Sequence, residues 1–183
     1  VAISAEMLQK ALSSDIKNTF NMISVDGDTS TNDMVTVLAN GMAGNEMITT
    51  EGEDFNTFCK ALNTVNVHLC KMIAGDGEGA TKLLECNVSG AKDEANAKIV
   101  AKSVIRSPLF KCAMFGSDAN WGRVLCAIGY AEADFDITKV DVDLASKAGR
   151  IAVCRNGAGL EFSEDEAKVV LTDDEIEIYI ELN

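Results

Sequence analysis

Residues 175–182 read Glu-Ile-Glu-Ile-Tyr-Ile-Glu-Leu, and this stretch is the most informative in the chain about its fold. Strict alternation places four aliphatic side chains on one face of an extended segment and the acidic and tyrosine side chains on the other. The aliphatic set is Ile176, Ile178, Ile180 and Leu182. The pattern predicts a half-buried antiparallel strand with a polar outer face.

The strongest helical signal lies at residues 51–74. Apolar side chains there recur with a period of 3.6 residues, at Phe55, Cys59, Leu62, Val65, Leu69 and Ile73. Acidic residues at the start of this stretch favour the positive end of a helix dipole. The sequence therefore predicts one long amphipathic helix.

Weaker signals predict the other elements. Helices are expected at residues 4–20 with Ser4 as N-cap, at 32–39, at 91–105 with Ala95, Ile99 and Ile105 facing inward, and at 124–131. Strands are expected at 21–25, 80–88 and 109–115, with further candidates at 139–144, 151–154 and 167–171. Helices and strands do not alternate strictly, which predicts an α+β protein with helices layered on antiparallel sheets.

The single proline, Pro108, predicts a domain boundary, because proline ends the helix before it. We place this boundary near Arg106–Pro108. It divides the chain into a region of residues 1–106 and a smaller, strand-rich region of residues 107–183.

Composition excludes some classes of partner. Apolar residues make up 47% of the chain, charged residues make up 25%, and the net charge is −13. Nucleic acids and anionic membranes bind positively charged patches, so neither is expected as the main partner. No stretch approaches the roughly 20 apolar residues of a membrane-spanning helix.

The six cysteines form no Cys-x-x-Cys pair, and most lie in apolar runs. This arrangement predicts buried, reduced thiols rather than disulfides. His68 is the only histidine, and its surroundings lack the ligand spacing of a zinc site, so no metal site is expected.

A first polar motif, Asp26-Gly-Asp-Thr-Ser-Thr-Asn-Asp33, follows an apolar stretch. Asp26 and Asp28 resemble the aspartate pair of Mg²⁺-dependent phosphatases, in which one carboxylate attacks and the other handles protons. A calcium loop is excluded, because Thr31 stands where a glycine is needed and Val37 where a glutamate is needed. The alternative is a solvated turn whose side chains cap the next helix.

A second motif, Gly75-Asp-Gly-Glu-Gly-Ala-Thr-Lys82, combines glycines with charged residues. Its spacing differs from that of a P-loop, and Asp76 and Glu78 would repel phosphate. A loop that brings a carboxylate close to a small cationic ligand fits better. The other interpretation is a plain turn between a helix and a strand.

The third motif is Ser117-Asp-Ala-Asn-Trp-Gly-Arg123. A buried Asp118–Arg123 pair that organises the loop is one prediction, and a wall of a substrate pocket is the other. None of the three motifs supplies a nucleophile with its base.

Taken together, these motifs resemble the ornithine acetyltransferase (glutamate N-acetyltransferase) family. The resemblance also includes Leu38-Ala-Asn-Gly41, Ala43-Gly-Asn45 and Ser107-Pro-Leu109, and the motifs occur in the family's order across nearly the whole chain. It implies an αββα fold of the N-terminal-nucleophile type, in which residues 1–106 belong to the catalytic domain.

The resemblance also implies an activity. The family's precursor cleaves itself before a threonine, which becomes the nucleophile of the β chain, and its own amino group serves as base. Acetyl passes from N-acetylornithine to the threonine and then to glutamate, in arginine biosynthesis. The α chain supplies oxyanion donors, and no metal or organic cofactor is required.

Compared with the family, this chain resembles an internal piece of a β chain, with the threonine nucleophile before Val1 and an aromatic-rich tail after Asn183. No catalytic residue is therefore assigned within it. Glu78 matches a family residue that contacts the amino-acid substrate, so we expect it to bind the substrate ammonium group. The expected partners are the α chain and a second αβ unit, and the expected location is the cytoplasm. The alternatives are the phosphatase and a non-catalytic binding or assembly module.

Overall fold

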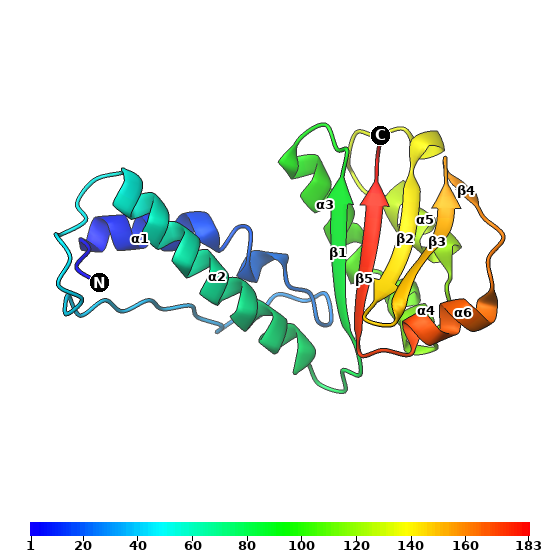
Figure 1. Ribbon diagram of the computed structural model, residues 1–183, viewed down its shortest axis with the longest axis horizontal. Coiled ribbons are helices and arrows are strands. Elements are labelled where there is room, and N and C mark those ends of the chain that lie inside the picture. The colour runs from blue at the N-terminus through cyan, green and yellow to red at the C-terminus, as the bar shows by residue number, and fades with distance from the viewer. The chain divides into compact units, whose positions relative to one another are not determined.

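The computed structural model describes residues 1–183, which form two compact units (Figure 1). The first unit comprises residues 1–23 and 28–74, and the second comprises residues 24–27 and 75–183. The predicted boundary near Arg106–Pro108 does not coincide with this division. The reason is that the helix before Pro108 packs on the sheet and helices of the second unit.

The first unit consists of α1 (Ala5–Asp15), a 3-10 turn η1 (Phe20–Met22) and most of the long α2 (Glu53–Gly75). Ser4 caps α1 as predicted, because its side chain accepts a hydrogen bond from the Met7 backbone N–H. The small core between these helices contains Met7, Ala11, Ile48 and Phe55. The helix predicted at 51–74 is thereby confirmed, and α1 ends earlier than predicted.

The segment between η1 and α2 contains neither the strand predicted at 21–25 nor the helix predicted at 32–39. Both predictions were wrong. The local composition explains the second result, since Thr, Val, Asn and Asp are poor helix formers and glycines follow closely. Gly41 and Gly44 adopt positive φ angles, which continue the chain in an irregular path.

The second unit is built on one five-stranded sheet with the order β1-β5-β2-β3-β4. The strands are β1 (Leu83–Ser89), β2 (Asp141–Ser146), β3 (Gly149–Arg155), β4 (Ala158–Gly159) and β5 (Glu175–Glu181). β5 pairs parallel to β1 and antiparallel to β2, so the sheet is mixed rather than purely antiparallel. The predicted α+β class is confirmed.

Four helices accompany this sheet: α3 (Glu94–Arg106), α4 (Pro108–Phe115), α5 (Trp121–Gly129) and α6 (Glu164–Leu171). The aliphatic residues of β5 that were predicted to face inward are all buried, together with Val142 and Leu144 of β2 and Val100 and Val104 of α3. A short turn, η2 (Ile137–Lys139), leads into β2. Thus this chain supplies one helical layer and one sheet layer, with the core between them.

Two predicted strands are helices in the structure. The apolar run 109–115 forms α4, because Ser107 caps it and Pro108 occupies its first position, where no N–H is needed. Residues 167–171 belong to α6, which begins after a second serine cap, Ser163. The inward face of α3 also differs from the prediction, since Val100, Ala101 and Val104 are buried whereas Ile99 is exposed.

All six cysteines are free thiols in the structure, but they are not all buried as predicted. Cys70 and Cys154 are buried, whereas Cys112 and Cys126 are exposed on α4 and α5. Burial raises the pKa of the Cys86 thiol to about 12. None of the helices is both long and apolar enough to cross a membrane.

Candidate functional site

Glu78 lies in the loop between α2 and β1, which we call the Glu78 loop (residues 75–82). The loop turns tightly, because the Ala80 N–H donates to the Gly77 carbonyl oxygen at 2.9 Å and Gly79 adopts a φ of +69°. Within this chain the Glu78 side chain is exposed, so its carboxylate is accessible to a ligand.

Lys82 fixes the end of the Glu78 loop. Its Nζ donates to the backbone carbonyls of Leu171 and Asp173, the latter at 3.0 Å, and lies 3.5 Å from the Ser117 hydroxyl oxygen. Burial lowers the pKa of the Lys82 ammonium group, and the nearby Asp173 and Asp174 partly oppose this shift. The second motif therefore meets the first residue of the third motif at Lys82.

The beginning of the first motif is held on the second unit by two cations. Arg106, at the end of α3, donates to the Gly27 carbonyl oxygen at 3.1 Å, and Lys111 of α4 donates to the Val25 carbonyl oxygen. Burial lowers the pKa of Lys111, and the charge of Asp26 opposes this effect. Asp28 belongs to the first unit, so the structure does not assign the two aspartates to one site. No group of three or more His, Cys, Asp or Glu side chains is arranged to hold a metal ion.

Asn45 organises the first residues of the chain. Its side-chain oxygen accepts from the Ala2 N–H at 2.8 Å, and its side-chain nitrogen donates to the Ala2 carbonyl oxygen at 2.9 Å. Two further backbone bonds join Ile48 to Ala2 and Ser4. The Gly41 N–H also donates to the Val1 carbonyl oxygen at 3.2 Å. Two motif residues, Gly41 and Asn45, thus position residues 1–4.

The third motif does not form the buried Asp118–Arg123 pair that was one prediction, because both side chains are exposed and no ion pair joins them. Asp118 instead accepts a hydrogen bond from the Asn120 side chain at 3.0 Å. Asn120 caps α5 by accepting from the Arg123 N–H. Trp121 packs so closely on Gly159 of β4 that no side chain fits between them.

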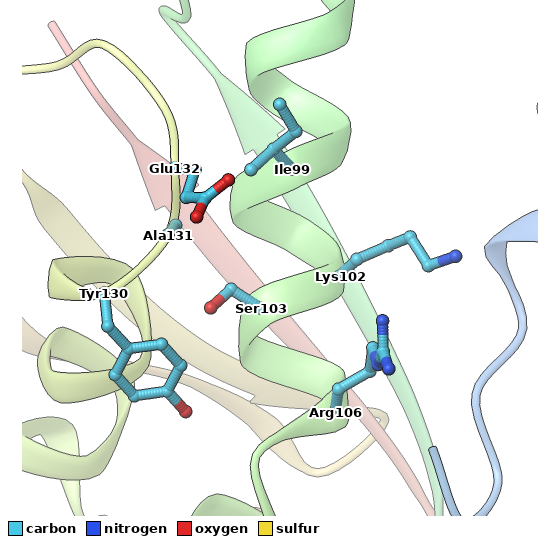
Figure 2. Close-up of a pocket in the computed structure, with 7 residues that line it drawn as sticks. All are labelled: Ile99, Lys102, Ser103, Arg106, Tyr130, Ala131 and Glu132. Carbon is cyan, nitrogen blue, oxygen red and sulfur yellow. The ribbon is translucent and has the colours of Figure 1, made fainter. Parts of the chain in front are cut away.

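A pocket of about 410 Å³ opens beside α3 and the end of α5 (Figure 2). It is lined by Ile99, Lys102, Ser103 and Arg106 from α3, and by Tyr130, Ala131 and Glu132 from the segment after α5. Ser103 donates to the Ala127 carbonyl oxygen at 2.5 Å, which ties α3 to α5. None of the sequence motifs indicated this pocket. The only signal in the sequence is the four-residue spacing of Lys102 and Arg106 on one predicted helix.

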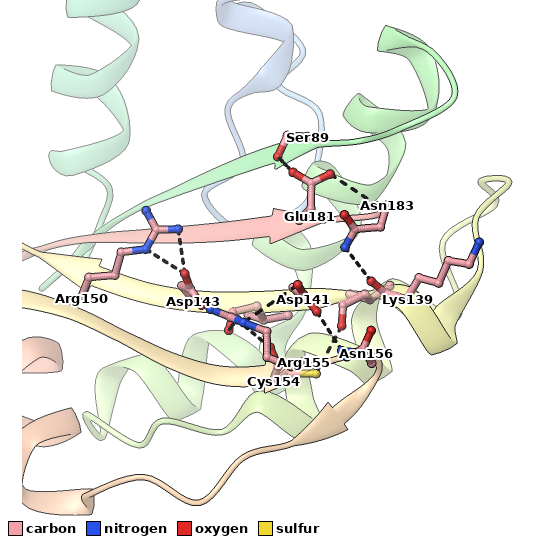
Figure 3. A network of polar contacts seen from close by, with 12 residues as sticks. Ser89, Lys139, Asp141, Asp143, Arg150, Cys154, Arg155, Asn156, Glu181 and Asn183 are labelled. Atoms are coloured by element: carbon pink, nitrogen blue, oxygen red, sulfur yellow. Dashed lines mark hydrogen bonds and ion pairs between the residues drawn. The ribbon is translucent and has the colours of Figure 1, made fainter.

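A network of charged residues covers the sheet face opposite the helices (Figure 3). Arg150 donates to Asp143 at 2.8 Å, and Arg155 forms an ion pair with the same carboxylate at 2.5 Å. Burial by itself would raise the pKa of Asp143, but the two arginines outweigh it and lower the pKa below its ordinary value. Arg150 also lies over the Tyr179 ring, 4.2 Å from its centre. The two arginines and the two aspartates of this network therefore pair with one another across β2 and β3.

Comparisons with known proteins match the whole chain to one family. A family model described as the ArgJ family matches residues 1–183. The chain is 51% identical over 181 residues to the arginine biosynthesis bifunctional protein ArgJ 1 of Clostridium acetobutylicum, covering 99% of this chain and 44% of that protein. It is 51% identical over 175 residues to the arginine biosynthesis bifunctional protein ArgJ of Caldanaerobacter subterraneus, covering 96% of this chain and 43% of that protein.

One solved structure has the same fold. The crystal structure of the arginine biosynthesis bifunctional protein ArgJ from Bacillus halodurans aligns with a TM-score of 0.93 and 44% sequence identity. The alignment covers 100% of this chain and 84% of that chain. The chain spans less than half the length of the curated relatives that it matches.

Proposed function

Because this chain belongs to the ArgJ family, we propose that its parent protein is a glutamate N-acetyltransferase of arginine biosynthesis. This enzyme moves the acetyl group of N2-acetylornithine to glutamate. The observation that carries the proposal is the family match over all 183 residues, with about half of the positions identical to a named bifunctional protein of arginine biosynthesis. All the polar motifs lie within the matched residues.

The proposed reaction has two balanced steps. First, the hydroxyl oxygen of a threonine that precedes Val1 attacks the acetyl carbonyl carbon of N2-acetylornithine. The C–N bond breaks, the hydroxyl proton passes by way of a base to the departing amine, and ornithine leaves. Second, the glutamate amine attacks the acetyl-threonine ester, the C–O bond breaks, and the threonine regains a proton. Oxyanion donors from the α chain stabilise the tetrahedral intermediates. No cofactor takes part.

Two residues of this chain have proposed roles in that reaction. Glu78 binds the ammonium group of the amino-acid substrate, because its carboxylate is exposed on a loop whose far end Lys82 holds in place. Asn45 is a proposed positioning residue, because its side chain holds the backbone of Ala2 with two hydrogen bonds and the proposed threonine lies earlier in the chain.

We further propose that the chain associates with the α chain of the same precursor, after self-cleavage, and with a second αβ unit in the cytoplasm. Exposed apolar side chains support this assembly. In the segment between η1 and α2, Met34, Leu38 and Met42 are 84%, 90% and 83% exposed. On α2, the later part of the predicted apolar stripe, Val65, Leu69 and Ile73, is also exposed. Covering such side chains contributes about 25 cal/mol per Å² of apolar surface.

The deciding experiment measures transfer of labelled acetyl from N2-acetylornithine to glutamate by the complete parent protein. We expect transfer and a transient acetylated threonine, detected by mass spectrometry of the digested enzyme. The 183-residue chain by itself should show no transfer, because the nucleophile and the oxyanion donors are absent from it. Absence of transfer by the complete protein would refute the proposed activity.

The two alternative functions, a phosphatase and a non-catalytic module, predict different results in these assays. A phosphatase that uses Asp26 and Asp28 would release phosphate from a phosphate ester in the presence of Mg²⁺, and Asp26→Asn would abolish this release. A non-catalytic module would show neither reaction. Light scattering on the native sample tests the assembly, since a single species with the mass of this chain alone would refute it.

A further inference from the structure

One edge of β1 is open to pairing with a further strand. β1 is the first strand in the sheet order β1-β5-β2-β3-β4, so only one of its two edges is paired (Figure 1). It is seven residues long, whereas β4, the strand at the opposite edge of the sheet, has only two residues. Proteins usually keep an unpaired strand edge short or cover it, because its N–H and C=O groups attract another strand.

The pairing with β5 shows which backbone groups of β1 point to the open edge. The Leu83 N–H donates to the Asp174 carbonyl oxygen at 2.7 Å, and the Ser89 carbonyl oxygen accepts from the Leu182 N–H at 3.0 Å. Alternate residues of a strand turn their backbone groups to the same side. The odd-numbered residues of β1 therefore bond to β5, and the even-numbered residues direct their backbone groups outward.

Three residues of β1 thus present six backbone groups at the open edge: Leu84, Cys86 and Val88. No backbone hydrogen bond joins these groups to another segment of the chain. The three side chains pack against the core, yet the residues are only partly buried, whereas the aliphatic residues of β5 beside them are almost completely buried. The open edge lacks both backbone partners and apolar cover, and a further strand would supply both.

The chain reaches this end of the sheet at Asn183. A Cβ on Gly90 would come within 2.8 Å of the Asn183 backbone nitrogen, and Gly90 directly follows β1. Neighbouring strands are about 4.8 Å apart, so roughly three extended residues would lead from the end of β5 past β1 to its open edge. A segment that turned there would run antiparallel to β1, an arrangement that needs only a short connection.

The relatives contain more chain than the 183 residues described. The structure from Bacillus halodurans aligns over 100% of this chain but over only 84% of its own chain. A second copy of β1 is a poorer occupant of the open edge. Each copy carries a net charge of −13, and Glu85 and Glu177 lie side by side on the polar face next to this edge, so two copies would bring like charges together.

We propose that residues of the parent protein after Asn183 form a further strand, antiparallel to β1 at its open edge. The backbone of this strand bonds to the outward N–H and C=O groups of β1. Its side chains alternate, with apolar ones extending the core surface and hydroxyl or basic ones beside Glu85 and Asn87. The proposal concerns the sheet alone and holds whether or not the parent protein transfers acetyl groups.

Hydrogen exchange of the complete parent protein, resolved to single amides by mass spectrometry, tests the pairing. Glu85 and Asn87 are the internal reference, because their N–H groups face β5. The amides of Leu84, Cys86 and Val88 should exchange within about tenfold of the reference rates. Exchange of these three amides at the rate of unpaired amides, with both reference amides still protected, would overturn the proposal.

Photochemical cross-linking identifies the occupant of the open edge. A p-benzoylphenylalanine in place of Asn87 stands on the polar face of β1, next to the proposed strand. The same group in place of Tyr179 is the matched control, because β5 lies between β1 and β2. In the complete parent protein, position 87 should cross-link to a peptide that follows Asn183 in the same polypeptide, and position 179 should not. Cross-links from position 87 that reach only β5, another segment or a second copy would overturn the proposal.

Discussion

Lys82 Nζ lies 3.0 Å from the backbone carbonyl oxygen of Asp173, a residue 91 positions further along the chain. The same ammonium group also binds the Leu171 carbonyl and contacts the Ser117 hydroxyl, so one side chain joins the Glu78 loop, the start of the third motif and the turn before β5. Lys82 thereby holds together segments that are far apart in the sequence.

Replacing Lys82 with Met should destabilise the chain by roughly 1–3 kcal/mol, because carbonyl groups lose their donor. Lys82→Arg keeps a cation and several donors, and it should recover part of this loss. Urea unfolding followed by circular dichroism measures both. If Lys82→Met unfolded at the same urea concentration as the wild type, the Lys82 contacts would contribute nothing to stability.

Asn45→Ala should slow acetylation of the parent enzyme, because Ala2 loses both of its side-chain hydrogen bonds. Asn45→Asp keeps the acceptor for the Ala2 N–H but loses the donor, so an intermediate rate is expected. Asn40→Ala is the control, since Asn40 accepts only from the nearby Met42 N–H. The measurement is the single-turnover rate of acetyl-enzyme formation, and equal rates for Asn45→Ala and Asn40→Ala would contradict the positioning role.

Glu78→Gln should raise the KM for N2-acetylornithine by about tenfold, with self-cleavage intact, because the substrate ammonium group loses an ionic partner. Asp76→Asn removes one charge from the same loop and serves as the control. Steady-state kinetics of both variants separate the specific contact from a general change in loop charge. An unchanged KM for Glu78→Gln would show that this residue belongs only to the turn.

Asp173 gives a prediction for acid unfolding. Its side chain is 3% exposed and pairs with Lys147 at 2.8 Å, and this hydrogen bond lowers the pKa of Asp173 from 3.8 to about 2. A lowered pKa in the folded state means that the stabilisation is complete above 3.8 and is lost as the pH falls toward 2. Urea unfolding of the wild type and of Asp173→Asn is measured at neutral pH and across this acid range. The free energy of unfolding should fall less in the variant than in the wild type as the pH decreases.

Gly159→Ala should destabilise the second unit by roughly 1–3 kcal/mol, because the added methyl group would overlap the Trp121 ring. Gly129→Ala is a matched control in α5, where a Cβ meets no atom within 4 Å. It should be neutral or slightly stabilising. Trp121 is the only tryptophan, so its fluorescence reports both the local change and global unfolding.

The sequence predicted the elements whose periodicity is long and regular. The helix at 51–74 and the strand at 175–182 were both identified from side chains that repeat over several turns or pairs. The polar outer face of β5 predicted antiparallel pairing, which holds for β2 but not for β1, whose pairing with β5 is parallel.

Short apolar segments were the main source of error. Leu109–Phe115 is apolar enough for a buried strand or a buried helix, and the caps at Ser107 and Pro108 decide the outcome. For the candidate site, the motifs located the loops but not the side chains that hold them. Asn45, Lys82 and Lys111 act through backbone carbonyl or N–H groups, which leave no pattern in a sequence.

The place of β5 in the sheet has a consequence for synthesis on the ribosome. β5 lies between β1 and β2, yet it comes later in the chain than every other strand. Until it has emerged, β1 lacks any strand partner in this sheet, and the aliphatic faces of β1 and β2 stay partly open. Pairing of residue 83 with residue 175 also closes a long loop, which slows folding. Nascent chains of this unit are therefore expected to depend on chaperones until β5 has been made, and a stall before residue 175 should expose them to aggregation.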